Sequence, residues 1–425
     1  MNVFFHTLGC KVNHYETQEM LEDLESKGYI AVKEPSKADI IIINSCTVTA
    51  ESDRKSRQAL RHYKKVNPNA VTVLTGCMPQ AYKGKDYSAL NADIILGNKT
   101  NGLLDEVIKE FIKSREPIIN VQEHQIGDLI QSRGIHCFEE RTRAYLKIED
   151  GCNRFCSYCA IPYARGRVRS KPIEDIVKEA SSLAENGFIE IVLVGINLSA
   201  YGQDLTDTDF PSAVKAVADI KGVRRVRLGS LEPDHLTDGV IDKLSKIDKL
   251  CPQFHISLQS GCDNTLKRMN RHYSAEEYLE LCKKLRNTFN NCTLTTDIMV
   301  GFSGETDEDF NETVEFVKKV GFEKVHIFPY SVREGTRAAE FDGRISNKTK
   351  TQRAKILAEV CNTIRTDFLK SQIGKSYDIL IEKSLSDGSL FGYTENYIPV
   401  IINPDSECID GKYIIRNSDS EYCYS

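Results

Sequence analysis

Three closely spaced cysteines constrain this chain more than any other feature of its sequence. Cys152, Cys156 and Cys159 have the spacing C-x3-C-x2-C and follow a short hydrophobic run. Three thiolates hold three irons of a [4Fe–4S] cube and leave the fourth iron open to another molecule. A structural zinc site requires a fourth local ligand, which the neighbouring Gly151 and Ala160 cannot provide. The spacing therefore favours an iron–sulfur cluster over a zinc knuckle or three chance cysteines.

Three more cysteines lie upstream, and each follows an apolar run that predicts a buried strand. They are Cys10, Cys46 and Cys77, after runs at residues 3–5, 40–43 and 71–74. Amphipathic stretches at 17–27 and 53–65 separate these runs, which predicts a doubly wound parallel sheet. Because ligands gather beyond the carboxyl ends of such strands, the three cysteines can converge on one site. The alternative is that each is a small buried hydrophobe, as free cysteines usually are.

These motifs resemble those of a known group of enzymes. The C-x3-C-x2-C spacing, with Tyr158 just before its last cysteine, is similar to that of the radical S-adenosylmethionine enzymes. Two sets of three cysteines in this order resemble the methylthiotransferases, radical enzymes that install a methylthio group on tRNA or on a ribosomal protein. The resemblance covers nearly the whole chain, and its motifs are long and specific.

The segment around Cys10 is similar to one branch of this family. Residues 7–13 (TLGCKVN) resemble the branch that acts on N6-threonylcarbamoyladenosine of tRNA, and segments 46–58 and 255–271 point the same way. The isopentenyl-adenosine branch usually has Gln-Met after the first Gly-Cys and the ribosomal-protein branch Pro-Lys, whereas this chain has Lys11-Val12. The resemblance implies conversion of N6-threonylcarbamoyladenosine at position 37, next to the anticodon, into its 2-methylthio derivative. Isopentenyl-adenosine tRNA and a ribosomal-protein aspartate remain alternative substrates.

The resemblance also implies the cofactors. A cluster on Cys152, Cys156 and Cys159 would pass one electron from an external donor to bound S-adenosylmethionine and give a 5′-deoxyadenosyl radical. A second [4Fe–4S] cluster on the upstream cysteines would hold the sulfur that is methylated and transferred. Two molecules of S-adenosylmethionine would be used per product, one as methyl donor and one as radical source. A C–H bond on adenine has no useful leaving group, so this substitution requires a radical cofactor.

The middle of the chain predicts an open barrel. Strand-like runs between about residues 143 and 336 cover 144–149, 189–195, 224–228, 253–258, 293–300 and 324–328, with helical stretches between them. Six strand–helix units are fewer than the eight of a closed barrel, and they fit the open (β/α)6 barrel of the radical superfamily. Polar or small residues follow successive strands, and the resemblance implies that they and Tyr158 contact S-adenosylmethionine: Gly195, Asn197, Ser230, Glu232, Ser257, Gln259, Asp297 and Gly301.

The last section predicts a small antiparallel β-barrel. Short apolar runs at 377–381, 390–393, 397–402 and 413–415 are separated by turn residues. The section resembles the TRAM-type RNA-binding domain that ends most methylthiotransferases, yet acidic residues outnumber basic ones here. Because affinity for phosphates depends on cations placed against them, RNA binding by this section stays open. We therefore expect an α/β protein with three domains, at residues 1–120, 138–370 and 371–425.

Two basic segments are candidates for RNA contact. The net charge of −5 does not indicate a nucleic-acid binder, so tRNA binding has to come from local patches. One candidate follows Cys46 and the other follows the C-x3-C-x2-C motif, and the phosphate-binding residues would be Arg54, Lys55, Arg57, Arg165, Arg167 and Arg169. The alternative for both segments is a solvated basic face.

The remaining features indicate an enzyme of a reducing compartment. The start of the chain lacks the pattern of a signal peptide, no run is long enough to span a membrane, and fourteen cysteines in a large chain suggest thiolate chemistry rather than disulfides. We expect a cytoplasmic protein with no membrane partner. The eight cysteines outside the two sets show no ligand spacing and are interpreted as structural. Two readings of another class are a non-catalytic iron–sulfur redox sensor and an RNA-binding protein with zinc knuckles.

Overall fold

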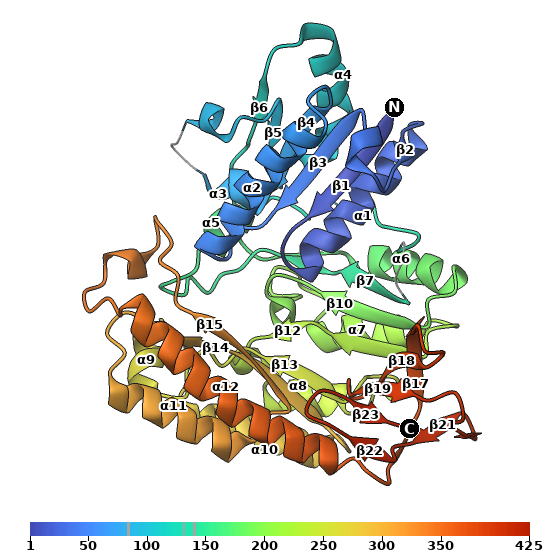
Figure 1. The fold of residues 1–425 in the computed structure, drawn as a ribbon, viewed down its shortest axis with the longest axis vertical. Coiled ribbons are helices and arrows are strands. Elements are labelled where there is room, and N and C mark those ends of the chain that lie inside the picture. Colours follow the sequence, from blue (N-terminus) through green and yellow to red (C-terminus); the bar gives the residue numbers. More distant parts are fainter. Residues whose placement is uncertain (83–85, 131, 139–141) are drawn as a thin grey trace.

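The computed structural model describes residues 1–82, 86–130, 132–138 and 142–425. Three sheet-containing parts follow one another along the chain (Figure 1). The N-terminal part (β1 to β6) lies at the top of the view, the central barrel (β7 to β15) in the middle, and the C-terminal part (β16 to β23) at the lower right. None of the helices in the described ranges combines the length and apolar character needed to cross a bilayer.

The N-terminal part is a six-stranded parallel sheet with the strand order β2-β1-β3-β4-β5-β6. Its strands are β1 (Asn2–Thr7), β2 (Ile30–Ala31), β3 (Ile40–Ser45), β4 (Val71–Gly76), β5 (Ile94–Leu96) and β6 (Ile118–Asn120). Its main helices are α1 (Lys11–Ser26), α2 (Ala50–Val66) and α4 (Leu104–Ser114). Ile40 and Ile42 pack with α1 and α4, while Ile41 and Ile43 pack with α2. The unbroken isoleucine run thus reflects a strand buried on both faces, and the predicted doubly wound sheet is confirmed.

The central part is a barrel of parallel strands wrapped by helices. Its strands are β7 (Arg143–Lys147), β10 (Glu190–Val194), β11 (Arg225–Leu228), β12 (Ser230–Leu231), β13 (Gln253–Ile256), β14 (Thr293–Val300) and β15 (Lys324–Pro329). Its longer helices are α6 (Ile173–Glu185), α7 (Phe210–Ala218), α8 (Asp238–Leu244), α10 (Ala275–Thr288), α11 (Asp307–Val320) and α12 (Asn347–Lys370). Only Gly229 separates β11, which pairs with β10, from β12, which pairs with β13. These two short strands therefore act as one, and six strand positions result, as predicted.

The barrel is open between its first and last strands. Among the described residues, β7 pairs only with β10 and β15 only with β14. The side chains of Lys324, His326 and Phe328, which alternate along β15, are exposed, whereas Val325 and Ile327 between them are partly buried. Because alternate residues of a strand point to opposite faces, one face of β15 borders a solvent-filled opening.

The C-terminal part consists of two small sheets. One has the order β16 (Ser376–Tyr377), β21 (Lys412–Ile414), β20 (Cys408–Ile409), and the other the order β17 (Ile379–Ser384), β18 (Leu390–Thr394), β19 (Pro399–Ile402), β23 (Cys423–Tyr424), β22 (Asn417–Ser418). Their core includes Leu369 at the end of α12. The pairing is antiparallel as predicted except between β19 and β23, which run parallel. The difference arises because the chain leaves this sheet for the β20–β21 hairpin before it returns to pair with β19.

Candidate active site

The C-x3-C-x2-C cysteines lie in a loop at the carboxyl end of β7. The short strands β8 (Glu149–Asp150) and β9 (Arg169–Ser170) pair across the base of this segment, which also contains α5 (Ile161–Arg165). Gly151 starts the loop with φ +90°, and a Cβ atom there would lie 2.0 Å from the Arg167 carbonyl oxygen. All three cysteines remain partly exposed. The loop is therefore closed tightly at its base and presents three thiols at one accessible site.

Polar groups point toward these thiols. The Arg271 guanidinium donates a hydrogen bond to Cys156 Sγ at 3.2 Å, and the Asn197 side-chain amide lies 3.8 Å from Cys152 Sγ. Two buried acceptor atoms nearby, Glu149 Oε1 and Asn197 Oδ1, have no hydrogen-bond partner among the described residues. Hydrogen bonds to cluster sulfurs and polar groups free to bind a ligand are what a cluster with an open iron requires. The residues present thus fit a [4Fe–4S] cluster.

A single metal ion fits less well. In the part of the chain that the structure describes, no group of three or more His, Cys, Asp and Glu side chains is arranged to hold one ion. A cube makes a different demand, because each thiolate binds a separate iron. Burial raises the pKa of Cys152 to about 12, so this thiol is protonated at neutral pH until a positive centre binds it.

The residues predicted to contact S-adenosylmethionine fall into two groups. The first group surrounds the cysteine loop: Asn197 donates its backbone N–H to Glu149 at 2.7 Å, and Gly195 leaves room for the same carboxylate. Arg271 binds Glu232 at 2.5 Å and the Ser257 carbonyl oxygen at 3.1 Å. Ser230 and Ser257 share a hydrogen bond of 3.1 Å between their hydroxyl groups.

The second group consists of residues that bond or pack with neighbours outside the cysteine loop. Gln259 has φ +70° and bonds through its backbone to β14, and Gly301 donates its N–H to Glu305 at 2.7 Å. Asp297 lies 3.2 Å from His255 Nε2. The Tyr158 ring packs edge-on against Phe302 at 6.2 Å between centroids. Which of these residues contact the cofactor stays a prediction.

The N-terminal cysteines come together at the carboxyl edge of their sheet. Cys10 precedes α1 after β1, Cys46 follows β3, and Cys77 begins α3 (Cys77–Ala81) after β4. The sulfur atoms of Cys10 and Cys77 lie 3.8 and 4.0 Å from Asn13 Oδ1. Gly9 has φ +112°, and a Cβ atom there would lie 2.7 Å from Cys46 Cβ, so the first loop approaches the second more closely than any other residue would allow. Three adjacent strands thus present three thiols at one place.

Arg165 connects the two cysteine sets. This residue closes the helix that follows the C-x3-C-x2-C loop, and its Nε donates to Cys77 Sγ at 3.1 Å. Its Nη2 donates to Asn13 Oδ1 and Glu16 Oε2, both at 2.9 Å. Lys147 adds ion pairs with Glu16 at 2.8 Å and with Asp150 at 3.1 Å. These side chains are almost fully buried, so a network of paired charges joins α1 to the barrel.

The structure corrects two of the predicted RNA contacts. Arg165 and Arg169 are 1% and 6% exposed, and Arg169 donates to the carbonyl oxygens of Arg165 and Arg167 at 2.8 and 3.0 Å. The prediction was wrong for these two residues, because Arg165 is buried against α1 and α3 of the N-terminal part and Arg169 folds back onto its own segment. Arg167 is exposed, and its guanidinium lies 4.7 Å from the Phe155 ring centroid.

The basic residues of α2 are accessible. Arg54 and Lys55 are exposed, Arg57 is partly exposed, and Arg54 also pairs with Glu51 on the same helix at 2.6 Å. These three residues and Arg167 can reach a phosphate, and their role in RNA binding stays a prediction.

Loss of the Arg165 side chain should cost stability rather than RNA affinity. Arg165→Ala leaves the carboxylates of Glu16 and Asp150 buried with one cation fewer, and breaking a buried ion pair in this way costs about 3–5 kcal/mol. We expect a lower free energy of unfolding in urea for the cluster-free protein. Arg167→Ala, a change at the surface, should alter stability by no more than about 0.5 kcal/mol. Equal stability of the two variants would contradict the role of the network.

Lys11 is a further candidate site residue, although in the sequence motif it serves only to distinguish the branches of the family. It is exposed to solvent at the start of α1, and the next residue, Val12, packs on Val192 and Val194 of β10. Although part of Lys11 reaches solvent, desolvation by the surrounding protein and the positive charges of Arg143 and Arg227 together lower its pKa to about 8, against the opposing effects of Cys10 and Glu190. No carboxylate among the described residues lies within ion-pair distance of its amino group. Lys11 thus brings an unpaired cation next to Cys10 at the opening of the barrel.

The barrel and its cysteine loop together define a radical S-adenosylmethionine enzyme. Residues 146–317 match the Radical SAM superfamily, and residues 2–97 match a family described as Uncharacterized protein family UPF0004. The fold is similar to that of TsrM, a radical S-adenosylmethionine methyltransferase from Kitasatospora setae, with a TM-score of 0.56 and 12% identity over 77% of this chain and 72% of that one. The cobalamin-dependent enzyme OxsB gives a TM-score of 0.52 over 85% of this chain and 57% of that one.

Similar proteins identify the family within the radical S-adenosylmethionine enzymes to which the chain belongs. The chain is 36% identical to Threonylcarbamoyladenosine tRNA methylthiotransferase MtaB of Bacillus subtilis, over 97% of this chain and 92% of the relative. It is also 36% identical to MtaB of Thermotoga maritima, over 93% and 90% of the two chains. The tRNA-2-methylthio-N(6)-dimethylallyladenosine synthase of Clostridium botulinum is 36% identical over 98% and 95%. The chain belongs to the methylthiotransferase family of radical S-adenosylmethionine enzymes, a family of sulfur transferases that use a [4Fe–4S] cluster and S-adenosylmethionine.

Proposed function

We propose that this protein is a tRNA methylthiotransferase that converts N6-threonylcarbamoyladenosine at position 37 into 2-methylthio-N6-threonylcarbamoyladenosine. Two molecules of S-adenosylmethionine and an external one-electron donor serve each reaction. The observation that carries the proposal is the meeting of two three-cysteine sites at one interface, connected by Arg165. The domains would be residues 1–120 with the second cluster, 138–370 with the radical centre, and 371–425.

The cysteines and the polar residues around them have different roles in this proposal. A [4Fe–4S] cluster with S-adenosylmethionine supplies the one-electron chemistry that an unreactive C–H bond requires. Cys152, Cys156 and Cys159 hold this cluster, and the upstream set holds a second one. The side chain of Arg271 is 3% exposed, and its bond to Glu232 fixes a carboxylate beside the first site. The polar residues at the strand ends, Asn197 foremost among them, orient S-adenosylmethionine.

The charge near Lys11 supports a threonylcarbamoyl group, rather than a dimethylallyl group, as the substituent of the substrate. A threonylcarbamoyl group carries a carboxylate, whereas the dimethylallyl group acted on by the Clostridium relatives is apolar. Lys11 offers an ammonium group beside Cys10 that is unpaired among the described residues, whereas the neighbouring Arg143 and Arg227 are both paired with Glu190. An apolar substituent placed there would desolvate this cation without compensation. A carboxylate would pair with it.

The proposal is tested with the anaerobically reconstituted protein and two tRNA substrates. One carries N6-threonylcarbamoyladenosine at position 37 and the other isopentenyl-adenosine, and the nucleosides are separated by mass spectrometry. We expect a methylthio product only from the first tRNA. Product from the second tRNA alone would move the protein to the isopentenyl-adenosine branch, and product from neither would leave the ribosomal protein as the substrate.

Lys11→Gln should reduce activity toward the threonylcarbamoyl substrate. A hydrogen bond to a charged group contributes about 1.5–3 kcal/mol, so we expect kcat/KM to fall about ten- to hundred-fold. Release of 5′-deoxyadenosine without tRNA should be unchanged, as should every rate in the control Lys215→Gln, which removes an exposed cation from α7. Full activity of Lys11→Gln would show that the carboxylate is bound elsewhere.

A further inference from the structure

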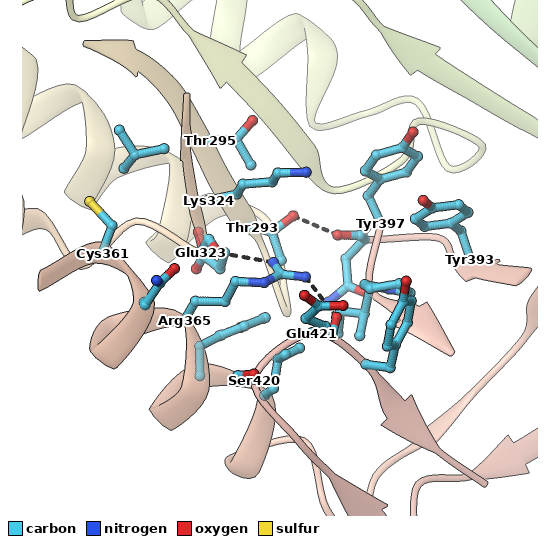
Figure 2. A pocket seen from close by; sticks show the side chains of 18 of the residues that line it. Thr293, Thr295, Glu323, Lys324, Cys361, Arg365, Tyr393, Tyr397, Ser420 and Glu421 are labelled. Carbon is cyan, nitrogen blue, oxygen red and sulfur yellow. Dashed lines mark hydrogen bonds between the residues drawn. The ribbon is translucent and has the colours of Figure 1, made fainter. Parts of the chain in front are cut away.

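A cavity of about 390 Å³ lies between the barrel and the C-terminal part. The first residues of β14 and β15, the C-terminal part of α12, residues 391–399 of β18 and the turn to β19, and the turn at 420–422 surround it (Figure 2). We call it the interdomain pocket, and the residues that matter here are Lys324, Arg365, Phe391, Tyr393, Tyr397 and Tyr422. None of them belongs to the two cysteine sites.

Two cations of the interdomain pocket form no ion pair with any of the described residues. Within the described residues, the Arg365 guanidinium donates to two backbone carbonyl oxygens, those of Glu323 at 3.3 Å and Glu421 at 2.9 Å (Figure 2). The ammonium group of Lys324, on β15, makes no hydrogen bond or ion pair within the described ranges. The Glu323 carboxylate is already paired with Arg286 at 3.2 Å. The pocket therefore presents donors that are free to bind an anion.

The two charges also act on each other. Burial lowers the pKa of Lys324, and the positive charge of Arg365 lowers it further. Burial likewise lowers the pKa of Arg365, although Glu421 partly opposes this effect. Two like charges in a partly desolvated place disfavour each other. An anion between them would relieve the repulsion.

The opposite wall is aromatic and held in place. The rings of Tyr393 and Tyr397 stack with 4.4 Å between centroids and 11° between planes, and the Arg143 guanidinium lies about 5 Å from both rings, at 5.1 and 5.0 Å. Phe391 packs edge-on against Tyr393 and Tyr422, at 5.2 and 6.0 Å. Rings fixed in this way offer a flat surface at little entropic cost, as in proteins that stack unpaired bases.

We infer that the interdomain pocket binds an unpaired nucleotide of the RNA substrate, with its phosphate between Lys324 and Arg365 and its base against the tyrosines. The inference rests on the proposed function, because it assumes that the substrate is an RNA. His326 and Phe328 continue from Lys324 along the exposed face of β15 toward the carboxyl ends of the strands. One strand therefore connects the pocket with the catalytic end of the barrel, at a distance of roughly 20 Å for six extended residues.

This arrangement explains how residues 371–425 can take part in RNA binding although acidic residues outnumber basic ones there. The C-terminal part supplies rings, while the cations come from the barrel and from α12. A domain that binds RNA in this composite way needs no basic surface of its own.

The inference is tested by tRNA binding to the full-length protein, measured by fluorescence anisotropy at several salt concentrations. The double variant Lys324→Gln/Arg365→Gln should bind about ten-fold more weakly, and the slope of log K against log salt should become shallower by about 0.7 for each cation removed. Lys412→Gln, which removes an exposed cation from β21, is the matched control and should bind like the parent protein. Because Arg365 also supports two carbonyl groups, the single variant Lys324→Gln is measured too and should show half of the change in slope.

The aromatic wall is tested separately. Tyr393→Leu should weaken tRNA binding about ten-fold, whereas Tyr393→Phe, which keeps the ring, should bind like the parent protein. Unchanged affinity and slope in the double variant and in Tyr393→Leu would overturn the inference. Binding needs no turnover, so loss of affinity in a protein that proves inactive on threonylcarbamoyladenosine would uphold the pocket and reject only the proposed substrate.

Discussion

Cys152→Ala, Cys156→Ala and Cys159→Ala should each abolish the reductive cleavage of S-adenosylmethionine. The loop offers three thiols, and a cube with only two protein ligands is labile. The measurement is 5′-deoxyadenosine released by the reconstituted protein in the presence of dithionite and without tRNA. We expect no product above background, together with loss of about half of the bound iron.

A matched control separates the loss of a ligand from general damage. Cys408→Ala removes an exposed cysteine of β20, far along the chain from both cysteine sets, and should leave cleavage close to normal. Deoxyadenosine formation at nearly the parent rate in any one of the three loop variants would show that its cysteine is not a cluster ligand.

The triple variant Cys10→Ala/Cys46→Ala/Cys77→Ala should separate the two halves of the reaction. These thiols belong to the N-terminal sheet, whereas the residues proposed for the radical site come from the barrel. We expect the variant to keep about half of the iron, to release 5′-deoxyadenosine, and to form no methylthio nucleoside on tRNA. It should also form no methylated acid-labile sulfur when S-adenosylmethionine is added without reductant.

Two other results would contradict this expectation. If the triple variant still methylthiolates tRNA, the upstream cysteines are structural and the proposed second cluster does not exist. If it no longer releases 5′-deoxyadenosine although its unfolding curve matches that of the parent protein, the two sites are not independent. The latter outcome would point to Arg165, which ends the helix after the C-x3-C-x2-C loop and donates to Cys77.

The elements that the sequence predicts best are those with a simple period. The isoleucine run at 40–43 predicts a strand buried on both faces, and β3 is that strand. Helix starts were predicted less well. The stretch 17–27 is the later part of α1, which begins at Lys11, because the buried positions of its first turns include the polar Asn13 and Glu16 and so hide the amphipathic pattern. Likewise α2 begins at Ala50, where the Thr49 side chain caps the Ser52 N–H.

The candidate site was predictable where residue type and strand ends carry the signal. The two sets of cysteines needed only spacing and the rule that parallel strands share one carboxyl edge. The environment of Arg165 could not be predicted in this way, since its main partner Glu16 is 149 residues distant in the sequence. Alternating arginines suit an exposed segment, and nothing local indicates that another part of the protein covers them. Arg271 and Glu149 were missed for the same reason.

The buried network between α1 and the barrel limits how this protein can evolve. Glu16 and Asn13 come from one end of the chain, and Lys147, Asp150 and Arg165 from its middle. An N-terminal domain taken from a protein without these partners would leave charges unmatched in the interface, at a cost of several kcal/mol. The two parts therefore cannot be exchanged as modules. New specificities must arise by point changes within the joined pair, and a chimaera needs both sides of the junction from one parent.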